Sequence, residues 1–159
     1  MNRLLVTATV LVLAAVVSGP LLAQSDPAVG TWKLNLAKSK YTNAPAPKSL
    51  TRTVEAQDNG VKVSYEGEAA DGSQIAYSFT ARFDGSDFAI TGSGTPAGAD
   101  FISLKRIKMN TTEATFRKGG GAVLIESSEV STDGKVATTK TKGVGANAKE
   151  SALAVFDKQ

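Results

Sequence analysis

The side chains that most often perform catalysis or bind metals are scarce in this sequence of 159 residues. It contains no histidine and no cysteine, which excludes Ser-His and Cys-His nucleophilic catalysis and the usual zinc ligands. Acidic pairs do occur, such as Glu66 with Glu68 and Glu126 with Glu129, and a glycosidase would need two carboxylates across a cleft. Glu66 and Glu68 fall on the solvent face of a predicted strand, so we interpret them as solubilising charges. We predict no catalytic residues, no metal site, no cofactor and no enzymatic activity.

Phosphate and nucleic-acid chemistry is also poorly supported. The glycine-rich stretches 92–94 and 119–121 lack the strand–helix setting and the lysine of a phosphate-binding loop, so we interpret them as ordinary loops. The net charge is +3, and basic residues are interspersed with acidic ones instead of gathering beside aromatic residues as they do in nucleic-acid-binding proteins. We predict no nucleic-acid partner.

Arg52 is the side chain of greatest chemical interest. Strand alternation places it on the same face as Leu50 and Val54, and a buried arginine is costly unless it is paired or hydrogen-bonded. One explanation is functional: Arg52, with the hydroxyls of Tyr65 and Tyr77, would hold the anionic head of an amphipathic ligand. The alternatives are that Arg52 reaches solvent at the mouth of the fold, or that the strand register slips there.

Arg106, which shares a face with Ile102 and Leu104, raises the same question. The residues that we predict to contact a ligand are Arg52, Val63, Tyr65, Tyr77, Phe79, Phe88 and Arg106.

The elements that would position these residues are short strands separated by regularly spaced turns. The turn sequences are Asn59-Gly60, Asp71-Gly72, Asp84-Gly85, Asn110-Thr111, Gly119-Gly120-Gly121 and Asp133-Gly134. This spacing is typical of an antiparallel meander that closes into a barrel. We predict strands near 30–36, 49–57, 61–69, 73–83, 88–92, 100–108, 112–118, 122–132, 135–143 and 151–157. Residues 37–48 are expected to form an irregular connection, because proline disrupts strand pairing.

The first two hairpins can be aligned from the sequence, since cross-strand partners on a buried face must both be apolar. A two-residue type I′ turn at Asn59-Gly60 would pair Val54 with Tyr65. A three-residue loop ending at Gly72, in a left-handed conformation, would pair Tyr65 with Tyr77.

A third hairpin, with a four-residue loop at 84–87, would pair Phe83 with Phe88 and Ala81 with Ile90. The three hairpins agree on one inward face, which comprises Val54, Val63, Tyr65, Ile75, Tyr77, Phe79, Phe83, Phe88 and Ile90.

The apolar pattern changes phase within 100–108. Ile102 and Leu104 share one face, whereas Phe101, Ile107 and Met109 share the other. A β-bulge would reconcile the two, and so would a strand buried on both sides; the sequence leaves both open.

The N-terminal segment 1–23 has the features of a secretory signal peptide: a basic start at Arg3, an apolar stretch, and Ala23 at the expected cleavage position. A membrane anchor is the alternative, but the apolar stretch is shorter than the roughly 20 residues that span a bilayer. We therefore predict a single domain over 24–159, with no membrane span after signal removal and a periplasmic or secreted location.

Several segments resemble known proteins. Gly30-Thr31-Trp32 is similar to the Gly-x-Trp signature of lipocalins, in which the tryptophan plugs the closed end of the barrel and an arginine on the last strand packs across it; residues 151–157 contain no arginine. More broadly, 30–41, 44–48, 102–106 and 131–135 resemble a group of small exported bacterial proteins of undetermined function that are regarded as lipocalin-like. The resemblance implies a barrel and export, and it supplies no catalytic residues.

Together these patterns predict an all-β fold, an up-and-down antiparallel meander closing into a lipocalin-like barrel of eight to ten strands. Two functions remain open. One is an exported, non-enzymatic protein that binds a small apolar or amphipathic molecule in the barrel lumen. The other is an envelope or extracellular interaction module with a solid barrel, whose loops at 44–47 and 91–99 contact a protein partner.

Overall fold

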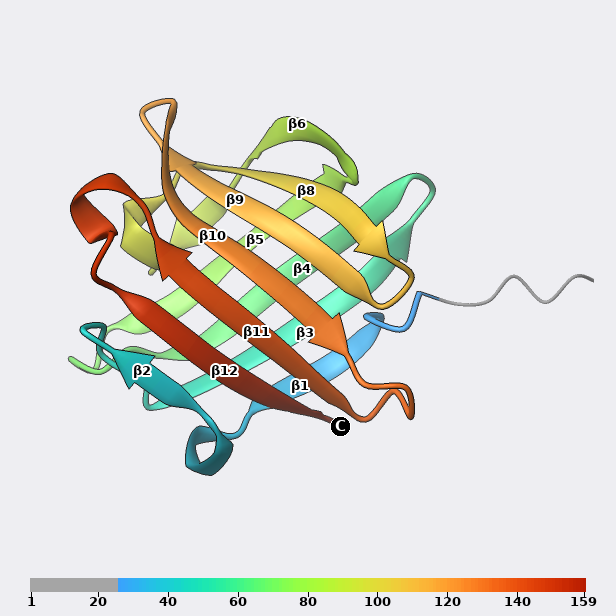
Figure 1. Cartoon of the computed structure of the whole chain (residues 1–159), viewed down its shortest axis with the longest axis horizontal. Coiled ribbons are helices and arrows are strands. Elements are labelled where there is room, and N and C mark those ends of the chain that lie inside the picture. Colours follow the sequence, from blue (N-terminus) through green and yellow to red (C-terminus); the bar gives the residue numbers. More distant parts are fainter. Residues whose placement is uncertain (1–25) are drawn as a thin grey trace, which may run out of the picture.

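The sheet curls around a single interior in the computed structural model, which describes residues 26–159 (Figure 1). The predicted signal peptide at 1–23 lies outside the described residues. Twelve antiparallel strands form the sheet. Their bounds are β1 Gly30–Leu34, β2 Lys40–Thr42, β3 Ser49–Gln57, β4 Gly60–Glu68, β5 Gln74–Arg82, β6 Asp84–Ala89, β7 Thr91–Ser93, β8 Phe101–Lys108, β9 Thr111–Lys118, β10 Gly121–Val130, β11 Val136–Gly143 and β12 Ser151–Lys158.

Three single-turn 3-10 helices, at Leu36–Lys38, Pro96–Gly98 and Gly145–Asn147, lie in the connections. Within the described part of the chain, no helix has the length and apolar character that a bilayer crossing requires.

The strand order confirms the predicted up-and-down barrel. Strands β8 to β12 pair in sequence, β12 pairs with β1, and β1, β3, β4 and β5 continue the series. The barrel is completed by the segment 84–93, whose first part, β6, pairs with β8 and whose second part, β7, pairs with β5. Ten strands have five or more residues, in agreement with the expected eight to ten. The short β2 was not predicted, and the single strand predicted at 88–92 is divided between β6 and β7.

The first hairpin keeps its predicted faces but not its predicted partners. Val54 pairs with Val63, and Gln57 pairs with Gly60, so the turn residues are Asp58 and Asn59. The register differs from the predicted one by two residues, and an even shift leaves every side chain on its predicted face. Gly60 does not have a positive φ; instead, a Cβ there would overlap the carbonyl oxygen of Ala81 on β5. The glycine therefore permits close strand packing, and the turn is not type I′.

The second hairpin has the predicted register, with Tyr65 opposite Tyr77 and Gly72 at a positive φ of 89°. The third was predicted wrongly, because 84–87 is not a hairpin loop. Asp84 accepts hydrogen bonds from the Ser86 amide (2.9 Å) and from Nε of Arg82 (2.8 Å). The chain turns away there through a bulge and pairs with β8 instead of β5.

Two further expectations are revised. The segment 37–48 is not wholly irregular, because β2 pairs with β12. In β8, a register shift occurs between Arg106 and Lys108, so the bulge is present, but it does not bring the outer residues inside. Ile107 and Met109 are 53% and 61% exposed, and the strand is therefore not buried on both apolar faces.

The core occupies the barrel interior and contains the predicted inward face. Six of the nine predicted residues are buried, namely Val54, Val63, Tyr65, Ile75, Tyr77 and Phe79. The other three, Phe83, Phe88 and Ile90, are partly buried and pack against this core. Strict alternation of apolar residues on β3, β4 and β5 thus determined which side of the sheet faces inward.

Candidate ligand-binding cavity

The barrel encloses two adjacent cavities, and Tyr65 and Glu126 contribute to the walls of both. The larger cavity has a volume of about 350 Å³. Its wall is formed by Tyr41, Ala44, Pro45, Pro47, Leu50, Tyr65, Ala69, Ala70, Ile75, Tyr77, Gly94, Pro96, Ala97, Leu124, Glu126, Thr139, Thr141, Glu150, Ser151, Ala152, Ala154 and Phe156. Much of this wall comes from the loops after β2, β4, β7 and β11, which gather at the left end of the barrel in Figure 1. We call this the open end.

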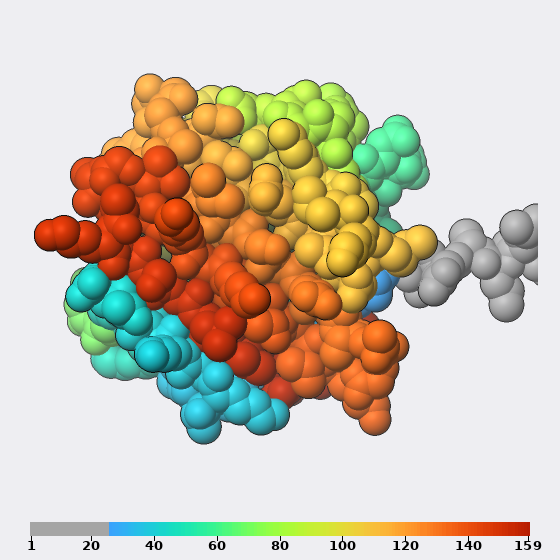
Figure 2. Space-filling model, in the orientation of Figure 1, coloured from blue at the N-terminus to red at the C-terminus, as the bar shows by residue number. Residues whose placement is uncertain are grey.

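The rim of the open end is visible on the molecular surface. In Figure 2, the loop between β11 and β12 (red) lies beside the β2 segment (cyan) at this end of the molecule. Both contribute to the larger cavity, through Glu150 and Tyr41 respectively. The cavity therefore extends from the rim to the middle of the lumen.

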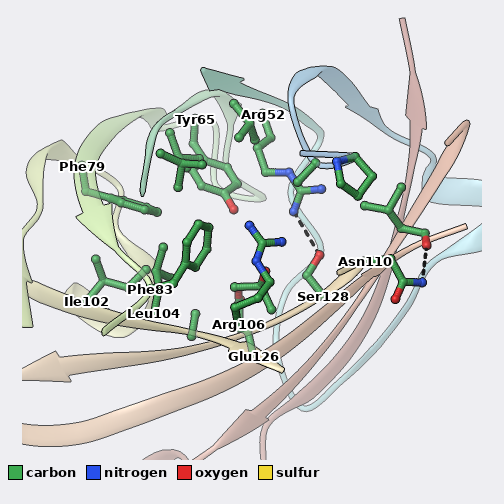
Figure 3. Close-up of a pocket in the computed structure, with 18 of the residues that line it drawn as sticks. Arg52, Tyr65, Phe79, Phe83, Ile102, Leu104, Arg106, Asn110, Glu126 and Ser128 are labelled. Carbon is green, nitrogen blue, oxygen red and sulfur yellow. Dashed lines mark hydrogen bonds between the residues drawn. The ribbon is translucent and has the colours of Figure 1, made fainter. Parts of the chain in front are cut away.

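The smaller cavity, of about 80 Å³, lies towards the opposite, closed end. Figure 3 shows Arg52, Arg106 and the aromatic rings of Tyr65, Phe79 and Phe83 around it. Pro27 and Ala28, from the segment that precedes β1, complete its wall. Its small volume leaves little space beyond that of a few water molecules.

Trp32 fills the closed end, as the lipocalin resemblance implied. Its side chain is fully buried, and Nε1 donates a 2.8 Å hydrogen bond to the carbonyl oxygen of Ala28. Two cations lie over the indole: the guanidinium of Arg52, at 5.7 Å, and the ammonium of Lys158, at 5.0 Å from the ring centroid. The last strand thus supplies a lysine over the indole and not the arginine that the resemblance implied.

Arg52 lies inside the barrel and is only 7% exposed, so the expectation that it reaches solvent at the mouth is wrong. Its guanidinium lies 4.7 Å from the centroid of the Phe156 ring, and one terminal nitrogen donates a long, 3.5 Å hydrogen bond to Ser128. Its Nε has no hydrogen-bond partner among the described residues. Arg52 lines the smaller cavity and is absent from the wall of the larger one.

Glu126 is the interior carboxyl that the sequence analysis did not select. It lies on β10 between Leu124 and Ser128, on the inward side of the strand, and its Oε1 accepts a 3.1 Å hydrogen bond from the Thr141 hydroxyl. Burial raises the pKa of the Glu126 carboxyl, and the hydrogen bond from Thr141 and the nearby charge of Arg52 only partly oppose this rise. Continuing the alternation backwards from Val130 would have placed Glu126 inside.

A polar strip continues from Glu126 towards the closed end. The Thr139 hydroxyl donates to Ser128 (3.1 Å), and Ser128 accepts from Arg52. The strip therefore contains two separate hydrogen-bonded groups, Arg52 with Ser128 and Thr139, and Glu126 with Thr141. Within each group, the bonded side chains fix one another's orientation in a medium of low polarity.

Tyr65 and Tyr77 form the wall opposite this strip. Their rings stack with centroids 4.7 Å apart and planes inclined by 19°. Burial raises the pKa of both phenols above the ordinary value of 10.0. Both hydroxyls therefore stay protonated at neutral pH and can donate hydrogen bonds.

Arg106 is already engaged within the protein. It forms an ion pair with Asp26, and its guanidinium lies 3.9 Å from the centroid of the Phe83 ring. This contact ties the segment before β1 across the closed end. Arg106 is thus part of the closure of the smaller cavity.

The structure does not bring the seven predicted ligand-contacting residues together at one site. Tyr77 lines only the larger cavity, whereas Arg52, Arg106, Val63 and Phe79 line only the smaller one. Tyr65 borders both. Phe88 lines neither cavity, and it packs beneath Arg82 with the guanidinium 5.1 Å from its ring centroid.

Comparison with known proteins supports the fold. No protein-family profile and no curated protein sequence matches this chain. Among solved structures, zebrafish ileal bile acid-binding protein in complex with cholic acid matches with a TM-score of 0.50 at 9% identity, over 84% of this chain and 99% of that one. A structure of EF1p2_mFAP2b bound to DFHBI matches with a TM-score of 0.42 at 10% identity, over 84% of this chain and 94% of that one. The first match shows that this chain has the same kind of antiparallel β-barrel fold as that protein.

Proposed function

We propose that this protein binds a small amphipathic molecule in the lumen of its barrel and does not transform it. The observation that carries the proposal is the larger cavity, whose volume of about 350 Å³ falls within the range of cavities that hold small ligands. Its wall is mainly apolar, and it includes a few polar side chains, among them Glu126, Thr141, Tyr65 and Tyr77. A mainly apolar wall with a few placed polar groups is typical of ligand sites.

The segments earlier considered as contact surfaces for a protein partner have a different role in this proposal. Ala44, Pro45 and Pro47, and Pro96 and Ala97 in the loop after β7, line the larger cavity. They would therefore form the entrance through which the ligand passes. An interaction module with a solid barrel is the weaker alternative, because a barrel packed solid with side chains would not contain a cavity of this size.

Export is part of the proposal. The segment 1–23 would direct the chain out of the cytoplasm, and the mature protein would act in the periplasm or outside the cell. A disulfide-free domain in that setting must be stable through its core alone. The barrel provides one continuous core, which includes Trp32 at the closed end and Ile75 in the wall of the larger cavity.

Native mass spectrometry of the protein purified from its own host, followed by solvent extraction, tests the binding function. We expect one small molecule per chain. A variant that fills the cavity, Ala152→Trp, should lose the molecule, whereas Ile125→Trp, at a position 38% exposed on the barrel exterior, should retain it. A mass without ligand that stays unchanged after incubation with alcohols, fatty acids, amines and small aromatic compounds would contradict the proposal and favour a protein partner.

A further inference from the structure

We propose that the larger cavity selects an amphipathic amine, whose protonated nitrogen pairs with Glu126 while its apolar part occupies the lumen. This inference rests on the proposed function and specifies its ligand class. Arg52 alone would favour an anionic ligand, whereas this proposal gives the ligand a positive charge, because the structure separates Arg52 from the larger cavity.

The charged residues of the larger cavity are all acidic. Of the described residues that form its wall, only Glu126 and Glu150 carry ionisable carboxyls, and none is a lysine or an arginine. Glu150 belongs to the loop before β12, at the open end, and Glu126 lies deeper, on β10. A cation entering this cavity would meet favourable charge at the rim and again inside, whereas a carboxylate would meet unfavourable charge at both positions.

Glu126 has one carboxyl oxygen without a hydrogen-bond donor among the described residues. Its Oε1 accepts the hydrogen bond from Thr141, and no described residue donates a hydrogen bond to Oε2. Burial disfavours the charged form of Glu126 and raises its pKa. An ammonium group beside Oε2 would supply the missing donor and stabilise the carboxylate.

Arg52 does not offer a pairing partner to an anionic group in the larger cavity. Its guanidinium is held between the rings of Trp32 and Phe156, and it borders only the smaller cavity, beyond the partition formed by Tyr65 and Glu126. An anionic head group in the larger cavity would therefore meet Glu126 before it reached Arg52.

The aromatic residues add to the selectivity. Tyr65 and Tyr77 line the larger cavity together, and stacked tyrosine rings attract cations through their faces. Tyr41 contributes a third phenol nearer the rim. A cavity whose wall contains both a carboxyl group and aromatic rings is a favourable environment for an ammonium group with an apolar substituent.

The test compares three probes with the same ten-carbon chain, namely decylamine, 1-decanol and decanoate, by isothermal titration calorimetry at pH 7.5. We expect decylamine to bind at least tenfold more tightly than decanoate, with 1-decanol between them. Glu126→Gln should weaken decylamine binding about tenfold and change 1-decanol binding less than twofold. Glu129→Gln, on the exposed face of the same strand, should change neither.

The outcomes separate the two proposals. Tighter binding of decanoate than of decylamine, or decylamine affinity unchanged in Glu126→Gln, would overturn the amine assignment and leave the binding function intact. No binding of any of the three probes would contradict both. A far-ultraviolet circular dichroism spectrum of each variant verifies that the barrel is retained, and the unchanged 1-decanol affinity is a second control for a folded Glu126→Gln lumen.

Discussion

Substitution of Trp32 should reveal how much of the barrel's stability comes from its closed end. Trp32→Ala removes a fully buried indole, and truncation of a buried Trp typically costs about 3–5 kcal/mol. The hydrogen bond from Nε1 to Ala28 adds about 1 kcal/mol. The substitution also removes the cation–π contacts of Arg52 and Lys158 with the indole, and each contact contributes about 0.5–1 kcal/mol. We expect a total loss of about 5–8 kcal/mol, a large part of the 5–15 kcal/mol typical of a domain.

Trp32→Phe gives a graded comparison, because it retains an aromatic face for both cations and removes the N–H donor. We expect it to cost about 2 kcal/mol, mainly from the lost hydrogen bond and a small cavity. Urea unfolding followed by circular dichroism measures all three proteins. Phe101→Ala, at an aromatic position 41% exposed on the barrel exterior, is the control and should cost less than about 1 kcal/mol. The reasoning is refuted if Trp32→Ala is no more destabilising than Phe101→Ala.

Three further predictions concern the carboxyl, a glycine and the ion pair at the closed end. The folded-state pKa of Glu126 is raised above its ordinary 4.5, so the wild type loses stability as pH rises through that pKa. Glu126→Gln does not titrate, and its free energy of unfolding in urea should therefore rise relative to that of the wild type between pH 4 and pH 8. A difference in free energy that shrinks as pH rises would count against the buried carboxyl. Gly92→Ala should lower the melting temperature through a cost of about 1–3 kcal/mol, since φ is 110° there and a Cβ would overlap the Ala76 carbonyl oxygen; a variant that melts like wild type would show that β7 does not pack on β5. Asp26→Asn should cost about 1 kcal/mol, because it breaks the partly buried pair with Arg106, and an equal loss in Lys62→Met, whose pair with Glu55 is exposed, would contradict this assignment.

The sequence determined the barrel and the inward faces of β3, β4 and β5 because these strands alternate strictly. Tyr65 and Tyr77 could be placed opposite each other from the loop length alone. The role of Gly60 could not be predicted in this way. A side chain there would overlap the Ala81 carbonyl oxygen on a third strand, so the glycine is needed for strand packing and not for its own turn. A local pattern carries no information about such a neighbour.

The partner change at 84–93 was missed for a similar reason. The segment 84–87 resembles a hairpin loop in sequence. In the structure, Asp84 accepts a hydrogen bond from the Ser86 amide within a bulge, and β6 pairs with β8. The choice between β5 and β8 depends on closing the whole barrel, which is a long-range condition.

The candidate site was only partly predictable. Alternation put Arg52 on the inward face, but it left open whether the guanidinium reaches solvent. The burial of Arg52, and its separation from the larger cavity by Tyr65 and Glu126, depend on how distant strands come together. Glu126 had a usable signal in the alternation of β10, from Leu124 to Val130. Its significance became clear only with the cavity wall, which four loops and seven strands build together.

The occupancy of the lumen is tested most directly by a nuclear magnetic resonance titration of the methyl-labelled protein with 1-decanol. The account predicts saturable shifts at one ligand per chain for methyl groups of the larger cavity, such as those of Ile75, Leu124 and Ala152. The methyl groups of the exposed exterior residues Ile107 and Met109 should not shift. Shifts confined to these exterior residues, or no saturable shift at all, would contradict the claim that this barrel holds its ligand inside.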